Sequence, residues 1–155
     1  MRRESPRALP ALLIAIGLAQ EKSFTYAGIG LGTELSALAA RHPGATLQGD
    51  YLRLSPDDTR DPISAIGISG TGAARRVRIM FERTSSAGSP VYPRCTEVET
   101  RLERDFGSPQ EVRRFTEEAS PRADRVWRSS TEEMTLICFR SRAVFRAEAV
   151  QITPR

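Results

Sequence analysis

The chain has 155 residues, a formal net charge of +4 at pH 7 and a sequence pI near 9.7, with 39% apolar and 27% charged residues. This length allows one ordinary domain with its own core and excludes a large multidomain enzyme, while the composition excludes a disordered tail and a multi-span membrane protein. The basic residues are arginines except for Lys22, and His42 is the single histidine. So little histidine and cysteine excludes His-rich metal sites, zinc-finger arrays and most His-dependent catalysis.

The N-terminal segment has the pattern of a secretory signal peptide. Three arginines and one glutamate in residues 1–7 precede an uncharged stretch at 8–19, and Gly17 and Ala19 stand at positions −3 and −1 of a cut before Gln20. A basic region, a short apolar region and a small-x-small site are typical of such peptides. Twelve helical residues span about 18 Å, short of the roughly 30 Å hydrocarbon core. We therefore expect cleavage near Ala19, over the alternatives of a membrane anchor or a helix of a cytosolic domain.

Cleavage changes both the length and the charge of the protein. Removing residues 1–19 takes away three arginines and one glutamate, so residues 20–155 form a mature chain of 136 residues with a net charge of +2. No cysteine stands at the cut, where Gln20 would be the first residue, so a lipid anchor is not expected. We predict a periplasmic or secreted protein with no permanent membrane anchor.

The two cysteines agree with export. Cys95 and Cys138 can form one disulfide in an oxidising compartment, closing a loop of 44 residues. The alternative is two separate buried thiols that act as small apolar side chains.

The first half of the mature chain, residues 24–83, predicts a helix followed by strands. Alternation of Val77, Ile79 and Phe81 with polar residues indicates a strand with one buried face, and Leu35 and Leu38 lie at helical spacing. We expect strands at 23–27, 47–55, 63–69 and 75–83, a flexible glycine-rich segment at 28–32, and a helix at 34–42 capped by Thr33.

The second half, residues 94–152, repeats this order after a Ser/Pro-rich linker at 84–93. Thr96 and Glu99 have the spacing of a capping box, and Gly107 is a suitable helix end. We expect a helix up to Phe106, a polar segment at 110–121 that is irregular or weakly helical, and strands at 124–129, 134–140 and 143–152.

These elements predict one α+β domain at 20–155, with an antiparallel sheet and helices packed on one face. The halves 24–83 and 94–152 can be read as two αβββ repeats; the alternative is that a helix followed by a meander is a common local pattern. The segment Leu31 to Leu35, with Pro43 and Gly44 after the helix, resembles small bacterial envelope proteins that pack a helical segment on a β-meander. Two such groups are the β-lactamase inhibitory protein and the small lipoprotein of the outer-membrane β-barrel assembly machine. The resemblance implies a protein-binding sheet and supplies no inhibitory residues.

Three other motifs fit ordinary structural roles better than ligand binding or catalysis. Gly28-x-Gly30-x-Gly32 mimics a dinucleotide loop, but its spacing is not G-x-G-x-x-G and no βαβ units follow, so we expect a strand-to-helix joint. His42 ends a helix, where packing or capping is expected rather than general-base chemistry. Three aspartates, Asp57, Asp58 and Asp61, lack the framework of a calcium loop, so we expect them to form a solvated turn.

The arginines and the single tryptophan are the remaining candidates. Trp127 is expected in the core, with an interface role as the alternative. The arginines are interspersed with glutamates and aromatics are only 6%, so we expect no nucleic-acid partner. Bidentate arginine contacts suit a protein or an anionic envelope polymer. The candidate binding residues are Arg76, Arg78, Arg128 and Arg140.

Together these features predict a non-enzymatic binding or accessory module of the cell envelope, with no catalytic residues, no metal and no cofactor. Two alternatives remain open. One is a small secreted hydrolase or inhibitor-like effector, which needs a concave site with titrating groups. The other is a cytosolic nucleic-acid-binding protein, which requires an uncleaved N-terminus.

Overall fold

The computed structural model describes residues 23–55, 63–81, 83–84, 87–116 and 120–155. The expected signal peptide at 1–19 lies outside these residues, as do Asp57, Asp58 and Asp61. Neither helix in the described part of the chain has the length and apolar character needed to cross a bilayer. The elements in chain order are β1 (Thr25–Tyr26), β2 (Ile29–Gly30), α1 (Leu35–Arg41), β3 (Thr46–Gln48), β4 (Tyr51–Leu54), β5 (Ile63–Ser69), β6 (Arg76–Phe81), β7 (Arg83–Thr84), β8 (Pro90–Val91), α2 (Cys95–Phe106), β9 (Glu111–Phe115), β10 (Arg122–Arg128), β11 (Glu132–Ser141) and β12 (Val144–Pro154).

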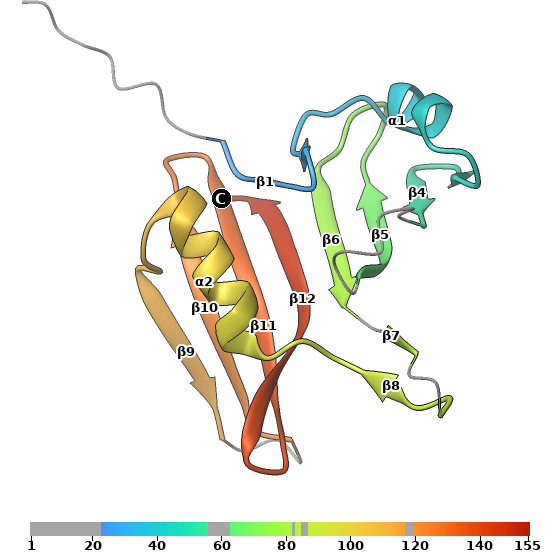
Figure 1. Ribbon diagram of the computed structural model, residues 1–155. Coiled ribbons are helices and arrows are strands. Elements are labelled where there is room, and N and C mark those ends of the chain that lie inside the picture. Colours follow the sequence, from blue (N-terminus) through green and yellow to red (C-terminus); the bar gives the residue numbers. More distant parts are fainter. Residues whose placement is uncertain (1–22, 56–62, 82, 85–86, 117–119) are drawn as a thin grey trace, which may run out of the picture.

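The fold is α+β, with two helices and one eight-stranded antiparallel sheet in the order β3-β4-β5-β6-β12-β11-β10-β9. Each helix is followed by strands that form one half of this sheet, and the two halves join where β6 pairs with β12 (Figure 1). Val77 lies opposite Ile152, and Ile79 lies opposite Val150. The join therefore rests on a pairing between strands about 70 residues apart in the chain.

The core lies between the sheet and the helices. Directly opposed residues on antiparallel strands point to the same side of the sheet, and the side chains that β4, β5, β6, β11 and β12 bury form one cluster with those of α1 and α2. Helix α2 lies on β11 and β12, and α1 contacts β4. Val98 and Leu102 of α2, at helical spacing, are 0% and 2% exposed, which agrees with the apolar face expected of this helix.

The strands differ from those expected at two places in the chain. The strand expected at 47–55 is two strands, β3 and β4, joined by a turn at Gly49 and Asp50, where Gly49 has a φ of 56°. The segment at 110–121, expected to be irregular or weakly helical, contains β9, which pairs with β10 along its whole length. Each half therefore has four strands in the large sheet, and the expected αβββ order is wrong by one strand in both.

The glycine-rich segment after the first strand is a hairpin rather than a flexible joint. β1 pairs with β2, and the two residues between them, Ala27 and Gly28, have φ values of 51° and 75°, as in the tight turns that match strand twist. The expected strand at 23–27 is thus only two residues long. The Ser/Pro-rich linker likewise folds back on itself, because β7 pairs with β8.

The helix boundaries are close to those expected, but the capping differs. Helix α1 starts after Glu34, with no side-chain cap, and the expected cap Thr33 instead donates its hydroxyl to Gly30 O at 2.8 Å. In α2 the carboxylate of Glu97 accepts from Arg94 N at 3.2 Å, so the cap begins two residues before the expected Thr96. Gly107 ends α2 as expected, at a φ of 80°.

The first described residues connect the two halves. Phe24 N donates to the buried carboxylate of Glu132 on β11 at 2.8 Å, and the Phe24 ring meets Phe106 of α2 edge-on at 5.4 Å between centroids. Tyr26 meets Phe81 of β6 in the same way at 5.8 Å. This segment therefore packs on elements of both halves. Its Phe24 N–H also gives the buried carboxylate of Glu132 the hydrogen-bond partner that a buried polar group requires.

Candidate functional site

One face of the large sheet is turned away from the core and carries the candidate site. On β6 the side chains of Val77, Ile79 and Phe81 are buried, while Arg76 and Arg78 alternate with them and are exposed. Strand register extends this alternation to the neighbouring strands. We call this surface the outer face, and its polar and aromatic members include Tyr51, Arg53, Ser69, Arg76, Arg78, Gln151, Thr135, Glu133, Arg128, Arg113 and Glu111.

The first half of the outer face contains a shallow hollow of about 350 Å³. Register places Ser69 beside Arg76, and Gly67 beside Arg78, which in turn lies beside Gln151 of β12. The hollow therefore crosses the join between the two halves of the sheet. Its lining residues are Tyr51, Gly67, Ser69, Arg76, Arg78, Met80 and Gln151.

Tyr51 forms one wall of this hollow because Gly67 has no side chain. A Cβ at Gly67 would lie 2.6 Å from the Tyr51 hydroxyl and 3.3 Å from two ring carbons, closer than real side chains approach. Glycine inside a strand weakens it and often marks a close approach of another group. The glycine thus allows the Tyr51 ring, which is 42% exposed, to lie over β5 beside the two arginines.

The two arginines of the hollow have no anionic partner in the described part of the chain. Arg76 and Arg78 are exposed, and neither side chain makes a hydrogen bond or an ion pair with a described residue. They are alternate residues of one strand, so their Cα atoms lie about 7 Å apart on the same face. The hollow is therefore an uncompensated positive site next to an aromatic ring.

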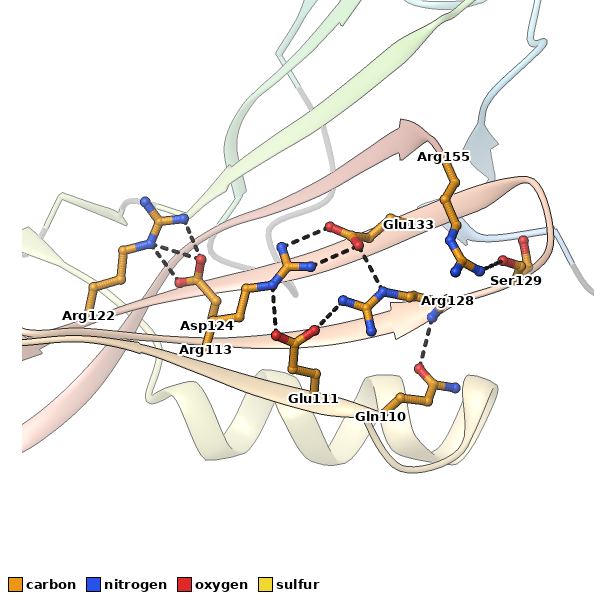
Figure 2. A network of polar contacts seen from close by, with 9 residues as sticks. All are labelled: Gln110, Glu111, Arg113, Arg122, Asp124, Arg128, Ser129, Glu133 and Arg155. Carbon is orange, nitrogen blue, oxygen red and sulfur yellow. Dashed lines mark hydrogen bonds and ion pairs between the residues drawn. The ribbon is translucent and has the colours of Figure 1, made fainter.

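The second half of the outer face is electrically different, because its charges are paired with one another (Figure 2). Arg113 donates from both terminal nitrogens to the two oxygens of Glu133, at 3.0 Å each, and from Nε to Glu111 at 3.2 Å. Arg128 donates to Glu133 at 3.0 Å and also to Glu111. We call these four residues the ion-pair network; they come from β9, β10 and β11.

The network shifts the ionisation of its members in the directions expected for paired charges. Hydrogen bonds from Arg128 and then Arg113 lower the pKa of the Glu111 carboxyl. Hydrogen bonds from Arg113 and then Arg128 outweigh the opposing effect of burial and lower the pKa of Glu133. The same contacts raise the pKa of both guanidinium groups. The network therefore stays fully charged, and compensated, near neutral pH.

The four candidate arginines do not come together. Arg76 and Arg78 lie side by side in the hollow, as expected. Arg128 shares the outer face but is held in the ion-pair network. Arg140 lies opposite Phe145, whose ring packs against the core, so Arg140 is on the opposite face near the end of β11. The one sequence signal for this hollow is Gly67, a glycine in the middle of the strand at 63–69, because such a glycine often marks a close approach of another group.

The remaining candidates have structural positions. Cys95 and Cys138 form the expected disulfide, with their Cα atoms 5.9 Å apart, and join the first residue of α2 to β11. Trp127 is fully buried, as expected for a core residue, and its Nε1 donates to Gly107 O at 2.7 Å. His42 is the half-buried C-cap of α1. Among the described residues there is no group of three or more His, Cys, Asp or Glu side chains that could hold a metal ion.

A second hollow, of about 310 Å³, lies between the segment before α2 and the β11–β12 hairpin. Two arginines line it, and one of them is engaged, because Arg146 stacks on Tyr92 at 4.3 Å and pairs with Glu148 at 2.7 Å. The hollow at Tyr51 differs from it in that neither of its two arginines pairs with a described residue.

Comparison of the chain with protein-family models, with curated protein sequences and with solved structures finds no match.

Proposed function

We propose that this chain is an exported, non-enzymatic binding module of the cell envelope, which engages its partner through the outer face of the sheet. The observation that carries the proposal is the pair Arg76 and Arg78 beside Tyr51, which no described residue neutralises. Planar guanidinium groups recognise carboxylates and phosphates in a bidentate manner. Two of them fixed on one strand form a surface suited to an anionic partner.

The proposed export rests on two features. Residues 1–19 have the signal-peptide pattern, and the disulfide between Cys95 and Cys138 is compatible with an oxidising compartment. N-terminal sequencing of the protein recovered from its native cells should find Gln20 first. Recovery of an intact Met1 would contradict export and favour the cytosolic nucleic-acid-binding alternative.

The proposed absence of catalysis is supported by where the reactive groups lie. Both thiols are consumed in the disulfide, and the single imidazole, His42, does not line the hollow. The charged side chains that line the hollow are arginines, which do not exchange protons near neutral pH. Binding is the chemistry that such a lining can perform.

We further propose that the domain is a tandem of two units, each with one helix and four strands, as the resemblance to small envelope proteins implies. In each half the residue before the helix forms an antiparallel bridge with a residue in, or shortly before, the last strand of that half: Glu34 with Ala73, which precedes β6, and Arg94 with Arg146 of β12. The backbone repeats the pattern, since Ala74 N donates to Thr33 O and Ala147 N donates to Pro93 O, at 2.8 and 2.9 Å. The hollow would then lie at the junction of the two units.

Capture of partners from an envelope extract tests the proposed function. The immobilised mature chain, residues 20–155, should retain a partner that is released by salt, because exposed ion pairs are screened. The double variant Arg76→Glu with Arg78→Glu should lose that partner. Arg140→Glu, which reverses a charge on the opposite face, is the matched control and should keep it. Equal capture by all three proteins would refute the outer face as the site.

A further inference from the structure

The hollow beside Tyr51 has a chemical specificity that goes beyond a positive surface. Resting on the proposed function, we infer that it seats a carboxylate side chain of an acidic, extended peptide segment of a partner protein. The carboxylate accepts hydrogen bonds from Arg76 and Arg78, while the neighbouring peptide contacts Tyr51 and Gln151.

The ion-pair network shows how two neighbouring arginines on this sheet bind carboxylates. In the second half, Arg113 and Arg128 share the carboxylates of Glu111 and Glu133, which stand between them on the outer face. In the first half, register brings Ser69 and Gly67 next to Arg76 and Arg78, and neither supplies an anion. Among the described residues, the first half therefore presents the arginines of such a network without carboxylates beside them, and a bound segment would supply the carboxylates.

The rest of the lining favours a peptide over a uniformly charged polymer. Ser69 and Gln151 offer hydrogen bonds for peptide groups, and the Tyr51 ring and Met80 offer apolar contact. A polyanion that continued across the sheet would meet Glu133 and Glu111 in the ion-pair network. A volume of about 350 Å³ is at the small end of ligand pockets, enough for one or two side chains.

Gly67 determines the shape of the hollow before any partner binds, because it leaves room for the Tyr51 ring. Because any side chain there would displace the Tyr51 ring, Gly67→Ala changes the shape of the hollow and leaves every charge in place. This separates a shaped site from simple attraction between opposite charges. Preorganised contacts reduce the entropy lost on binding, so the shape should matter to affinity.

Fluorescence anisotropy with three labelled probes tests the inference. The probes are a short peptide that alternates glutamate with serine, the same peptide with glutamine in place of glutamate, and an oligogalacturonate of similar charge. The glutamate peptide should bind, and the glutamine peptide should not. Arg78→Gln should weaken binding about tenfold, as the loss of a charge-assisted hydrogen bond does, while Arg140→Gln should leave it unchanged.

The shape variants decide between a seat and non-specific attraction. Gly67→Ala and Tyr51→Ala should each raise the Kd of the glutamate peptide by about threefold or more, because each removes contacts between the peptide and the Tyr51 ring. Tyr51 is exposed, so its replacement tests the seat even if Gly67→Ala fails to fold. Unchanged affinity in Tyr51→Ala, or tighter binding of oligogalacturonate than of the peptide, would overturn the inference. If the peptide does not bind while the Arg76 and Arg78 double variant still loses its envelope partner, the inference fails and the proposed function stands.

Discussion

Reduction of the Cys95–Cys138 disulfide is expected to lower the free energy of unfolding by about 4 kcal/mol. The cross-link closes a loop across a sequence separation of 43 residues, and in the chain-entropy account a loop of this length restricts the unfolded chain by about that amount. Both cysteines are almost fully buried, at 1% and 0% exposure, and the bond joins the start of α2 to β11. Reduction therefore releases conformations in the unfolded state and leaves native contacts in place.

Urea unfolding of the oxidised and reduced protein measures this difference. Trp127 is the single tryptophan and is fully buried, so its fluorescence reports unfolding of the core. The reduced protein should also show a larger m value, because its unfolded chain exposes more surface. The double variant Cys95→Ala with Cys138→Ala, measured with and without reductant, controls for effects of the reductant itself. A stability change below about 1 kcal/mol on reduction would refute the loop-entropy reasoning.

Two further changes probe the second half of the sheet. Trp127→Phe removes the donor to Gly107 O and leaves space in a fully buried site. It should therefore lower the free energy of unfolding by about 2–3 kcal/mol, measured by urea unfolding followed by circular dichroism. A decrease of less than about 0.5 kcal/mol would count against this hydrogen bond. The pKa of Glu133 is lowered by Arg113 and Arg128 from its ordinary value of 4.5, so its pairing stabilises the fold above that pH and the stability is lost as pH falls through the lower folded value. Between about pH 7 and about pH 3, the free energy of unfolding should therefore decrease less in Glu133→Gln than in the wild type. An equal decrease in the two proteins would contradict the ion-pair network.

The strands with alternating apolar residues were predictable from local pattern alone. Val77, Ile79 and Phe81 were expected on one face of a strand, and all three are buried in β6. Strand β9 was missed for the opposite reason. It is the edge strand, Val112 and Phe115 are 41% and 37% exposed, and no alternation marks a buried face. Its structure comes from pairing with β10, which is a tertiary contact.

The candidate site was half predictable. Arg76 and Arg78 were grouped correctly because they are alternate residues of one strand, and the period of two is a local property. Arg128 and Arg140 were grouped with them only by residue type. Whether an arginine on another strand joins this pair depends on register, on the irregularity at Ile137 and Cys138, and on which carboxylates lie next to it.

The sequence by itself determined the α+β class, the buried face of strands such as β6 and the helix end at Gly107, and it limited the two cysteines to a single possible intramolecular pair, with separate thiols as the alternative. These are properties of local periodicity and of residue chemistry. Only the tertiary structure decided that β6 lies beside β12, which arginines are neutralised, and that a hollow forms at Tyr51. The physical reason is that strands pair through backbone hydrogen bonds, which are nearly the same for every residue, so side-chain identity specifies the face of a strand far better than its neighbour.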